Sequence, residues 1–148
     1  MKIRLIRTLL AIALLASVAV AAAKDVPMKG GGSGMITALT PGPNGVEITA
    51  VGDGEATQLG KFSRQEQILL NPATGTFTGT IIFTAADGAE LNCNFAGAFT
   101  GPNTASGTYT FAGGTGRFEG ASGIAYFSIV QSDPANFTFQ FAGTIDTN

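Results

Sequence analysis

The sequence feature that most constrains the fold is a series of short segments in which apolar and polar residues alternate. The alternation is clearest over residues 76–85, where Phe77, Ile81 and Phe83 share one face and threonines occupy most of the other. A period of two places alternate side chains on opposite faces of a β-strand, and Asp-Gly or Asn-Pro pairs separate such segments by turns. Because no segment after residue 23 shows a helical period, we expect one all-β domain, folded as a barrel or a sandwich.

Composition favours a closed barrel over a sandwich. The chain has 21 glycines, one cysteine and no tryptophan, whereas an immunoglobulin-type sandwich is built around a cysteine pair and a tryptophan. Closure also removes the exposed sheet edges along which strands can aggregate. An outer-membrane barrel needs aromatic girdles, and two tyrosines without tryptophan cannot build them. We therefore expect a soluble, antiparallel β-barrel, closed or nearly closed.

A glycine-dense segment, residues 107–123, connects two of the expected strands. Tyr109 and Phe111 alternate with threonines and predict a strand that stops at the glycines that follow. Glycine adopts positive φ without steric cost, so the chain can turn tightly while a central phenylalanine points back to the core. No helical segment and no Lys-Ser or Lys-Thr pair follows, which argues against a phosphate-binding loop. We expect a structural turn formed by Gly113, Gly114, Gly116, Arg117, Phe118 and Gly120.

The same turn carries a family resemblance. G-G-T-G-R-F-E-G-A-S-G at residues 113–123 resembles the corresponding segment of plant dirigent proteins and, less closely, of allene oxide cyclases. T-Q-L-G-K-F at residues 57–62 and G-T-I-I-F-T-A-A-D-G-A-E-L at residues 79–91 look like segments of small exported bacterial proteins with that barrel. The resemblance implies an eight-stranded antiparallel barrel over residues 46–146. It assigns no catalytic residue, because only the glycine segment aligns.

The N-terminal 23 residues have the composition of a secretory signal peptide. Lys2, Arg4 and Arg7 precede an apolar run, and Ala21 and Ala23 supply an A-x-A cleavage site. The apolar run is short for a membrane span. We expect residues 1–23 to be a signal peptide, residues 24–44 a flexible glycine-rich leader with one short strand at 35–39, and residues 45–148 the barrel domain. The mature protein would be periplasmic or secreted, with no membrane attachment after cleavage.

Charge and residue types exclude several functions. Three of the eight basic residues lie in the expected signal peptide, so five remain against ten acidic residues, a net charge of −5. Such a chain lacks the basic surface that nucleic-acid binding requires. The absence of histidine removes the Ser-His and Cys-His nucleophile systems and the commonest zinc ligand. We therefore expect no nucleic-acid partner, no metal and no cofactor.

Arg64 and Glu66 have the same parity as the apolar residues of their segment, such as Phe62 and Ile68. If that parity holds, a charged pair points into the barrel, where it is costly unless mutually satisfied. An inward pair would give a ligand cavity a polar spot, and a carboxylate in an apolar pocket can acquire a raised pKa suited to proton transfer. The favoured alternative is a bulge over residues 64–67, or a position at the barrel mouth, that turns both charges to solvent.

The remaining candidates form the expected interior. Cys93 lies on an apolar face and should behave as a small hydrophobe rather than a reactive thiol. Arg117 either binds an anion at the mouth or, as we favour, caps loop carbonyls, pairs with a carboxylate or faces water. Aromatic residues at inward parity either wall a cavity or simply fill the core. The cavity candidates are Glu66, Arg64, Phe77, Phe83, Cys93, Phe95, Tyr109, Phe111, Phe139 and Phe141.

These observations favour an exported, non-catalytic barrel that binds a small apolar ligand or has a structural role. The family resemblance implies two alternatives: cyclisation or isomerisation of a lipid-like substrate, or guidance of a radical coupling performed elsewhere. It also implies a homo-oligomer, a dimer or a trimer. The segment 124–130, apolar on both faces, would be buried between its subunits.

Overall fold

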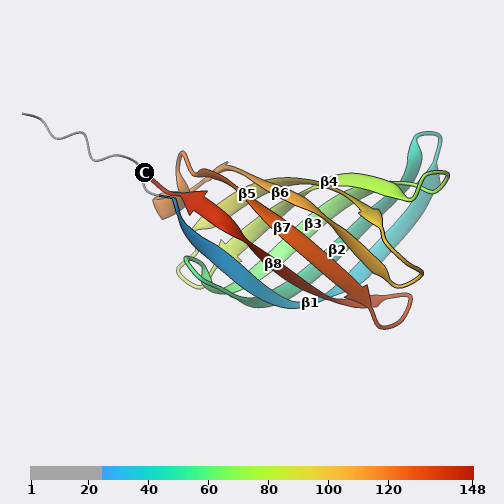
Figure 1. Cartoon of the computed structure of the whole chain (residues 1–148), viewed down its shortest axis with the longest axis horizontal. Helices are drawn as coiled ribbons and strands as arrows, with labels where there is room; N and C mark the ends of the chain where they lie inside the picture. Colours follow the sequence, from blue (N-terminus) through green and yellow to red (C-terminus); the bar gives the residue numbers. More distant parts are fainter. Residues whose placement is uncertain (1–24) are drawn as a thin grey trace, which may run out of the picture.

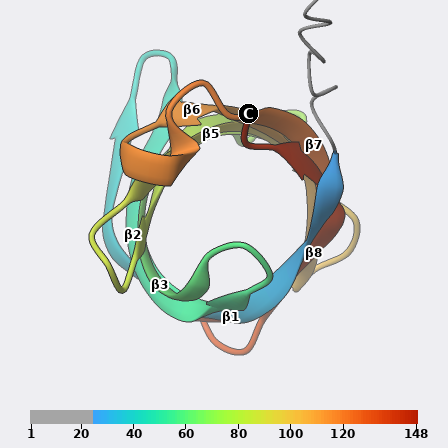
Figure 2. The ribbon, with the colours of Figure 1, turned by 90° about the vertical axis from the view of Figure 1, so that its left-hand side faces the viewer.

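The computed structural model describes residues 25–148, which form a closed antiparallel barrel in which each strand pairs with its neighbours in sequence and β8 returns to β1 (Figures 1 and 2). This confirms the expected eight-stranded barrel. The expected signal peptide lies outside the described residues and stays a prediction. The strands are β1 (Val26–Gly42), β2 (Gly45–Ala56), β3 (Gly60–Asn71), β4 (Thr76–Ala85), β5 (Glu90–Phe99), β6 (Thr104–Gly114), β7 (Ser122–Gln131) and β8 (Asn136–Asp146), with a 3₁₀ helix η1 (Gly116–Phe118) between β6 and β7.

The glycine-rich leader expected between residues 24 and 44 is instead mostly the first strand of the barrel. β1 pairs with β2 from Gly30 to Gly42 and with β8 from Val26 to Met35. The expectation was wrong because glycines in a strand hide its period of two while allowing close approach of a neighbouring segment. At Gly34, a side chain would collide with the ring of Phe137 on β8. The barrel therefore begins at Val26, and the short strand expected at residues 35–39 is part of this longer one.

The two ends of the barrel are built differently. η1 and the turn between β2 and β3 lie at the same end as the C-terminus, and the turn folds over the opening (Figure 2). Phe118 in η1 is fully buried, and Leu59 in the turn is buried beside the same core. We call this the plugged end. The opposite end is formed by the hairpins that join β1 to β2, β3 to β4, β5 to β6 and β7 to β8 (Figure 1).

Aromatic side chains fill most of the interior between the two ends. Tyr109 and Phe127 stack with ring centroids 4.6 Å apart, and Phe62 meets Phe83 edge to face at 5.2 Å. Such pairs add about 0.5–1.5 kcal/mol each beyond the burial of their area. The interior is therefore a packed core along most of its length.

The outer wall of β7 is apolar and open to solvent. Ile124, Tyr126 and Val130 are among the most exposed large apolar residues of the described chain, while Phe127 points inward. The segment is thus apolar on both faces, as its sequence indicated. No helix within residues 25–148 has the length and apolar character needed to span a bilayer.

Candidate functional site

A cavity of about 90 Å³ lies inside the barrel at the end opposite η1. All eight strands contribute to its wall, which is largely apolar and includes Ile36, Ile48, Phe77, Phe95, Phe127 and Phe137. Phe99 and Asn103 also line it and are partly or largely exposed, so the cavity reaches the surface between the hairpins. One ordered water needs about 10–15 Å³ of such volume. The cavity can therefore hold several waters or part of a small organic molecule.

The wall of the cavity includes a buried ion pair on β3. The Arg64 Nη2 atom lies 2.8 Å from Oε2 and 3.0 Å from Oε1 of Glu66, and both side chains are at most 5% exposed. β3 pairs with β2 and with β4 in unbroken register across these residues. The favoured bulge or mouth interpretation is therefore wrong, and the inward alternative is correct. The parity of the strand continues because the pair satisfies itself, which removes the need for a bulge.

The arginine is held on three sides. Its Nη1 donates a hydrogen bond to the Tyr109 hydroxyl at 3.0 Å, and its guanidinium lies 3.8 Å from the centroid of the Phe139 ring. Burial lowers the pKa of Arg64, but Tyr109 and Glu66 raise it by more, so this pKa lies above its usual value. The guanidinium therefore stays charged. Its Nε is the one buried side-chain nitrogen or oxygen in the described part of the chain that has no hydrogen-bond partner.

Tyr109 is almost completely buried. Burial raises the pKa of its hydroxyl to about 12, although Arg64 acts in the opposite direction. The hydroxyl is therefore protonated at neutral pH. Its oxygen accepts the hydrogen bond from Arg64, and within residues 25–148 the hydroxyl donates no hydrogen bond of its own. Tyr109 thus has an unused donor beside the cavity. We call Arg64, Glu66 and Tyr109 together the polar floor.

The sequence candidates divide into two groups. Five line the cavity: Arg64, Glu66, Phe77, Phe95 and Tyr109. The other five are buried in the surrounding core and do not line it: Phe83, Cys93, Phe111, Phe139 and Phe141. The cavity is also lined by residues outside the predicted set, among them Ile36, Ile48, Ile68, Phe127, Ile129 and Phe137. Their position in each strand could have identified them. Consecutive strands run in opposite directions, so inward residues near the end of an odd-numbered strand and near the start of an even-numbered strand lie at the same end of the barrel.

Cys93 is a core residue. It is 1% exposed, and its thiol contacts the carbonyl oxygen of Asn94 at 3.4 Å. Burial raises the pKa of this thiol to about 12. Because the thiolate is the nucleophilic form, the buried thiol acts as a small apolar side chain at neutral pH. Within residues 25–148, no group of three or more cysteine, aspartate or glutamate side chains is arranged to hold a metal ion.

The glycine-dense segment forms a tight turn between β6 and β7. Gly113, Gly116 and Gly120 have φ of 78°, 58° and 72°, a region that favours glycine. At Gly114, a side chain would collide with the carbonyl oxygen of Glu90. These four glycines let the chain wind through η1 and return Phe118 to the core.

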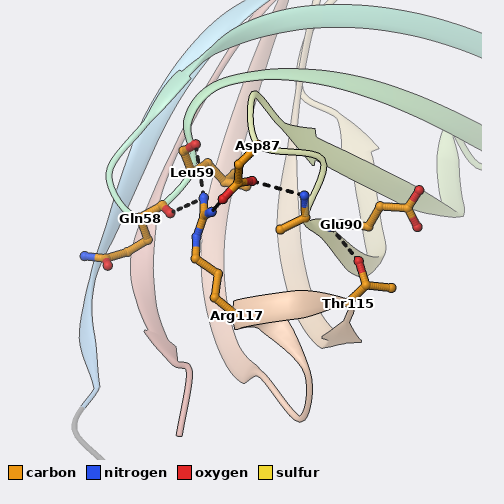
Figure 3. A network of polar contacts seen from close by, with 7 residues as sticks. Gln58, Leu59, Asp87, Glu90, Thr115 and Arg117 are labelled. Carbon is orange, nitrogen blue, oxygen red and sulfur yellow. Dashed lines mark hydrogen bonds and ion pairs between the residues drawn. The ribbon is translucent and has the colours of Figure 1, made fainter.

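Arg117 links three turns at the plugged end (Figure 3). It pairs with Asp87 and donates to the carbonyl oxygens of Gln58, at 3.1 Å, and Leu59, at 3.4 Å. Nearby, the Glu90 backbone nitrogen donates to the Thr115 hydroxyl at 3.0 Å. The favoured interpretation of Arg117 as a cap for loop carbonyls and a partner for a carboxylate is confirmed.

Comparison with known proteins supports the architecture. No family model matches the chain, and no curated protein sequence matches it significantly. Among solved structures, a pterocarpan synthase dirigent protein superposes with a TM-score of 0.52 and 14% sequence identity, covering 83% of this chain and 85% of that one. At this identity the similarity shows the fold alone. The barrel is dirigent-like.

Proposed function

We propose that this dirigent-like barrel is an exported protein that binds one small, mainly apolar molecule in the cavity opposite its plugged end. The observation that supports this most directly is a cavity of about 90 Å³ that opens to the surface and is lined by the buried side chains of Arg64, Glu66 and Tyr109. Ligand sites are concave and mostly apolar, with a few placed polar groups. The N-terminal signal features support the exported location.

A purely structural barrel would have little reason to keep this arrangement. Protein interiors are close-packed, and an unfilled cavity lowers stability. A buried ion pair is often no more stabilising than apolar side chains of the same volume. The pair of Arg64 and Glu66, together with a guanidinium Nε that lacks a partner, therefore favours a binding role over simple core filling.

A second candidate is catalysis, either isomerisation or cyclisation of the bound molecule or guidance of a coupling reaction. The likeness to a pterocarpan synthase dirigent protein and the contact of Arg64 with a carboxylate and a phenol favour it. Against it, the pKa of Tyr109 is raised to about 12, far from the neutral range in which proton transfer is efficient. Binding without conversion is therefore our first choice.

Native mass spectrometry of the full chain expressed in its own host tests the proposal. We expect one small molecule per chain, released unchanged by denaturing extraction, or uptake of one from a lipid extract. Ala105→Phe should abolish uptake, because Ala105 lines the cavity. Ala142→Phe is the control, because Ala142 is exposed on the outside of β8.

The same experiment can contradict the proposal. An empty barrel that takes up nothing from the extract would overturn binding. Equal uptake by the Ala105→Phe variant would place the bound molecule elsewhere. Recovery of the added molecule in a rearranged form would favour the catalytic candidate.

A further inference from the structure

We propose, building on the binding function above, that the ligand is an uncharged molecule with a hydroxyl group at one end. In this arrangement the hydroxyl reaches the polar floor and hydrogen-bonds to both Tyr109 and Glu66. Arg64 holds these two partners in place. The apolar remainder of the ligand lies along the phenylalanines and isoleucines toward the mouth.

The hydrogen-bonding capacity left over at the floor indicates the kind of group that fits. Within the described chain, the Tyr109 hydroxyl accepts from Arg64 but donates to nothing. Each carboxylate oxygen of Glu66 accepts one hydrogen bond, from Arg64 Nη2, and each has a second lone pair. Beside the cavity, the floor thus offers at least one unused donor, the Tyr109 hydroxyl, and at least one acceptor on Glu66. A hydroxyl group both accepts and donates, so it can satisfy the two together.

Geometry places the donor and the acceptor next to each other. Tyr109 and Glu66 bind the two terminal nitrogens of the same guanidinium, at 3.0 Å and 2.8 Å. The guanidinium is planar and rigid, which holds its partners in a defined arrangement. Its position against the Phe139 ring restrains it further. An ether or ketone oxygen would accept from Tyr109 and leave Glu66 unused, which makes it the poorer match.

The charge of the floor excludes ionic ligands. Arg64 and Glu66 neutralise each other, and they lie on an otherwise apolar wall. A bound carboxylate or ammonium would add a buried charge without its own partner, which carries a large desolvation cost. An anion that took the place of Glu66 at Arg64 Nη2 would push the Glu66 carboxylate into apolar surroundings. The floor is therefore selective for neutral molecules.

Four probes of similar size test this on the unmodified full chain: 1-hexanol, its isomer methyl pentyl ether, hexanoate and hexylammonium. Binding at pH 7 is measured by ¹³C-methyl NMR of isoleucine. Ile36, Ile48 and Ile68 line the cavity, whereas Ile82 and Ile124 are exposed on the outer wall and serve as internal controls. We expect 1-hexanol to shift the cavity signals with an affinity at least about fivefold above the ether, because one more hydrogen bond is made. Hexanoate and hexylammonium should bind more than about tenfold more weakly than 1-hexanol.

Two variants identify the groups responsible. Tyr109→Phe should remove most of the preference for 1-hexanol, while Tyr126→Phe is the matched control because Tyr126 is 70% exposed. Glu66→Gln leaves Arg64 without a counter-charge, so hexanoate should gain at least about tenfold relative to 1-hexanol. Glu47→Gln, at an exposed position on β2, should change neither ratio. If Glu66→Gln does not fold, the four probes on the unmodified chain still decide the question.

The outcomes separate this inference from the binding function. Equal affinity of 1-hexanol and the ether, or an ion that binds as tightly as 1-hexanol, would overturn the inference. If no probe binds but a different molecule is extracted from the cavity, the hydroxyl inference fails and the binding function stands. If nothing is extracted and nothing binds, both fail.

Discussion

Arg64 and Arg117 each form an ion pair with a carboxylate, but one pair is buried and the other is exposed. Arg117, at the plugged end, pairs with Asp87 where both side chains are exposed by 41% and 59%, and it ties down neighbouring turns through their carbonyl oxygens. Arg64, toward the other end, pairs with Glu66 where both are almost fully buried. An exposed pair contributes about 0–1 kcal/mol. A buried pair is costly to assemble and far costlier to break.

The two ends of the barrel differ in the same way. At the plugged end, Phe118 and Leu59 fill the opening, and exposed polar groups fasten the turns around them. At the other end the hairpins leave a cavity, and the polar groups lie inside it. One end is thus built for stability and the other retains unsatisfied hydrogen-bonding capacity. This difference is what favours binding at the second end.

Breaking the buried pair should have the largest effect. Glu66→Ala leaves Arg64 charged and uncompensated in the core, so the free energy of unfolding should fall by about 3–5 kcal/mol. The double variant Arg64→Met with Glu66→Leu should lie close to the unmodified protein, because both charges are gone. Urea unfolding followed by circular dichroism measures both. A double variant as unstable as the single one would contradict the proposed cost of the unpaired charge.

Truncating Phe118 at the plugged end should lower the free energy of unfolding by a comparable or slightly smaller amount. Phe118 is fully buried against the core, so Phe118→Ala should destabilise the barrel by about 3–5 kcal/mol. Phe99→Ala is the matched change at the cavity end, where Phe99 is 45% exposed. We expect it to cost less than about 1 kcal/mol, within the range of surface substitutions. Similar urea midpoints for the two variants would show that the ends do not differ as described.

Alkaline pH should destabilise the protein because it ionises two buried acids, Tyr109 and Cys93. The folded pKa values of Tyr109 and Cys93 are about 12, above the ordinary values of 10.0 and 9.0. Their contribution to stability is fully present below the ordinary values and is lost as the pH rises toward 12. In that window each group should remove about 1.4 kcal/mol per pH unit.

Urea unfolding at pH 8, 9, 10 and 11 measures this slope, and a flat profile would contradict it. In the Tyr126→Phe variant, Tyr109 is the one remaining tyrosine. Its ultraviolet titration should therefore give a value near 12 directly. Cys93 is likewise the only cysteine, so its alkylation at pH 8 should proceed only as fast as the barrel opens.

The exposed pair should give the smallest effect. Asp87→Asn removes the counter-charge of Arg117, but both groups are hydrated, so the loss should stay below about 1 kcal/mol. High salt should shrink it further, because exposed charges are screened. Urea unfolding at 0.05 M and 1 M sodium chloride provides the test. A loss above about 2 kcal/mol would contradict the small contribution expected of an exposed pair.

Much of the barrel could be predicted from local pattern. Phe77, Ile81 and Phe83 alternate with threonines and are buried, and Gly113, Gly116 and Gly120 mark a turn with positive φ. Such features depend on neighbouring residues alone, so the sequence contains them. Most of β1 was missed because its glycines carry no alternation, and its place is decided by pairing with β2 and β8.

By itself the sequence determined the all-β class and which residues have inward parity, and its family resemblance supplied the number of strands. The level of each inward residue along the barrel axis came only from the tertiary structure. That level depends on the stagger of neighbouring strands and on closure, which are properties of the whole sheet. It separates Phe77 and Phe95, in the cavity wall, from Phe83 and Phe139, outside it. It also brings Tyr109 on β6 to Arg64 on β3, 45 residues away in sequence, which gives the inward guanidinium a second hydrogen-bond partner besides Glu66.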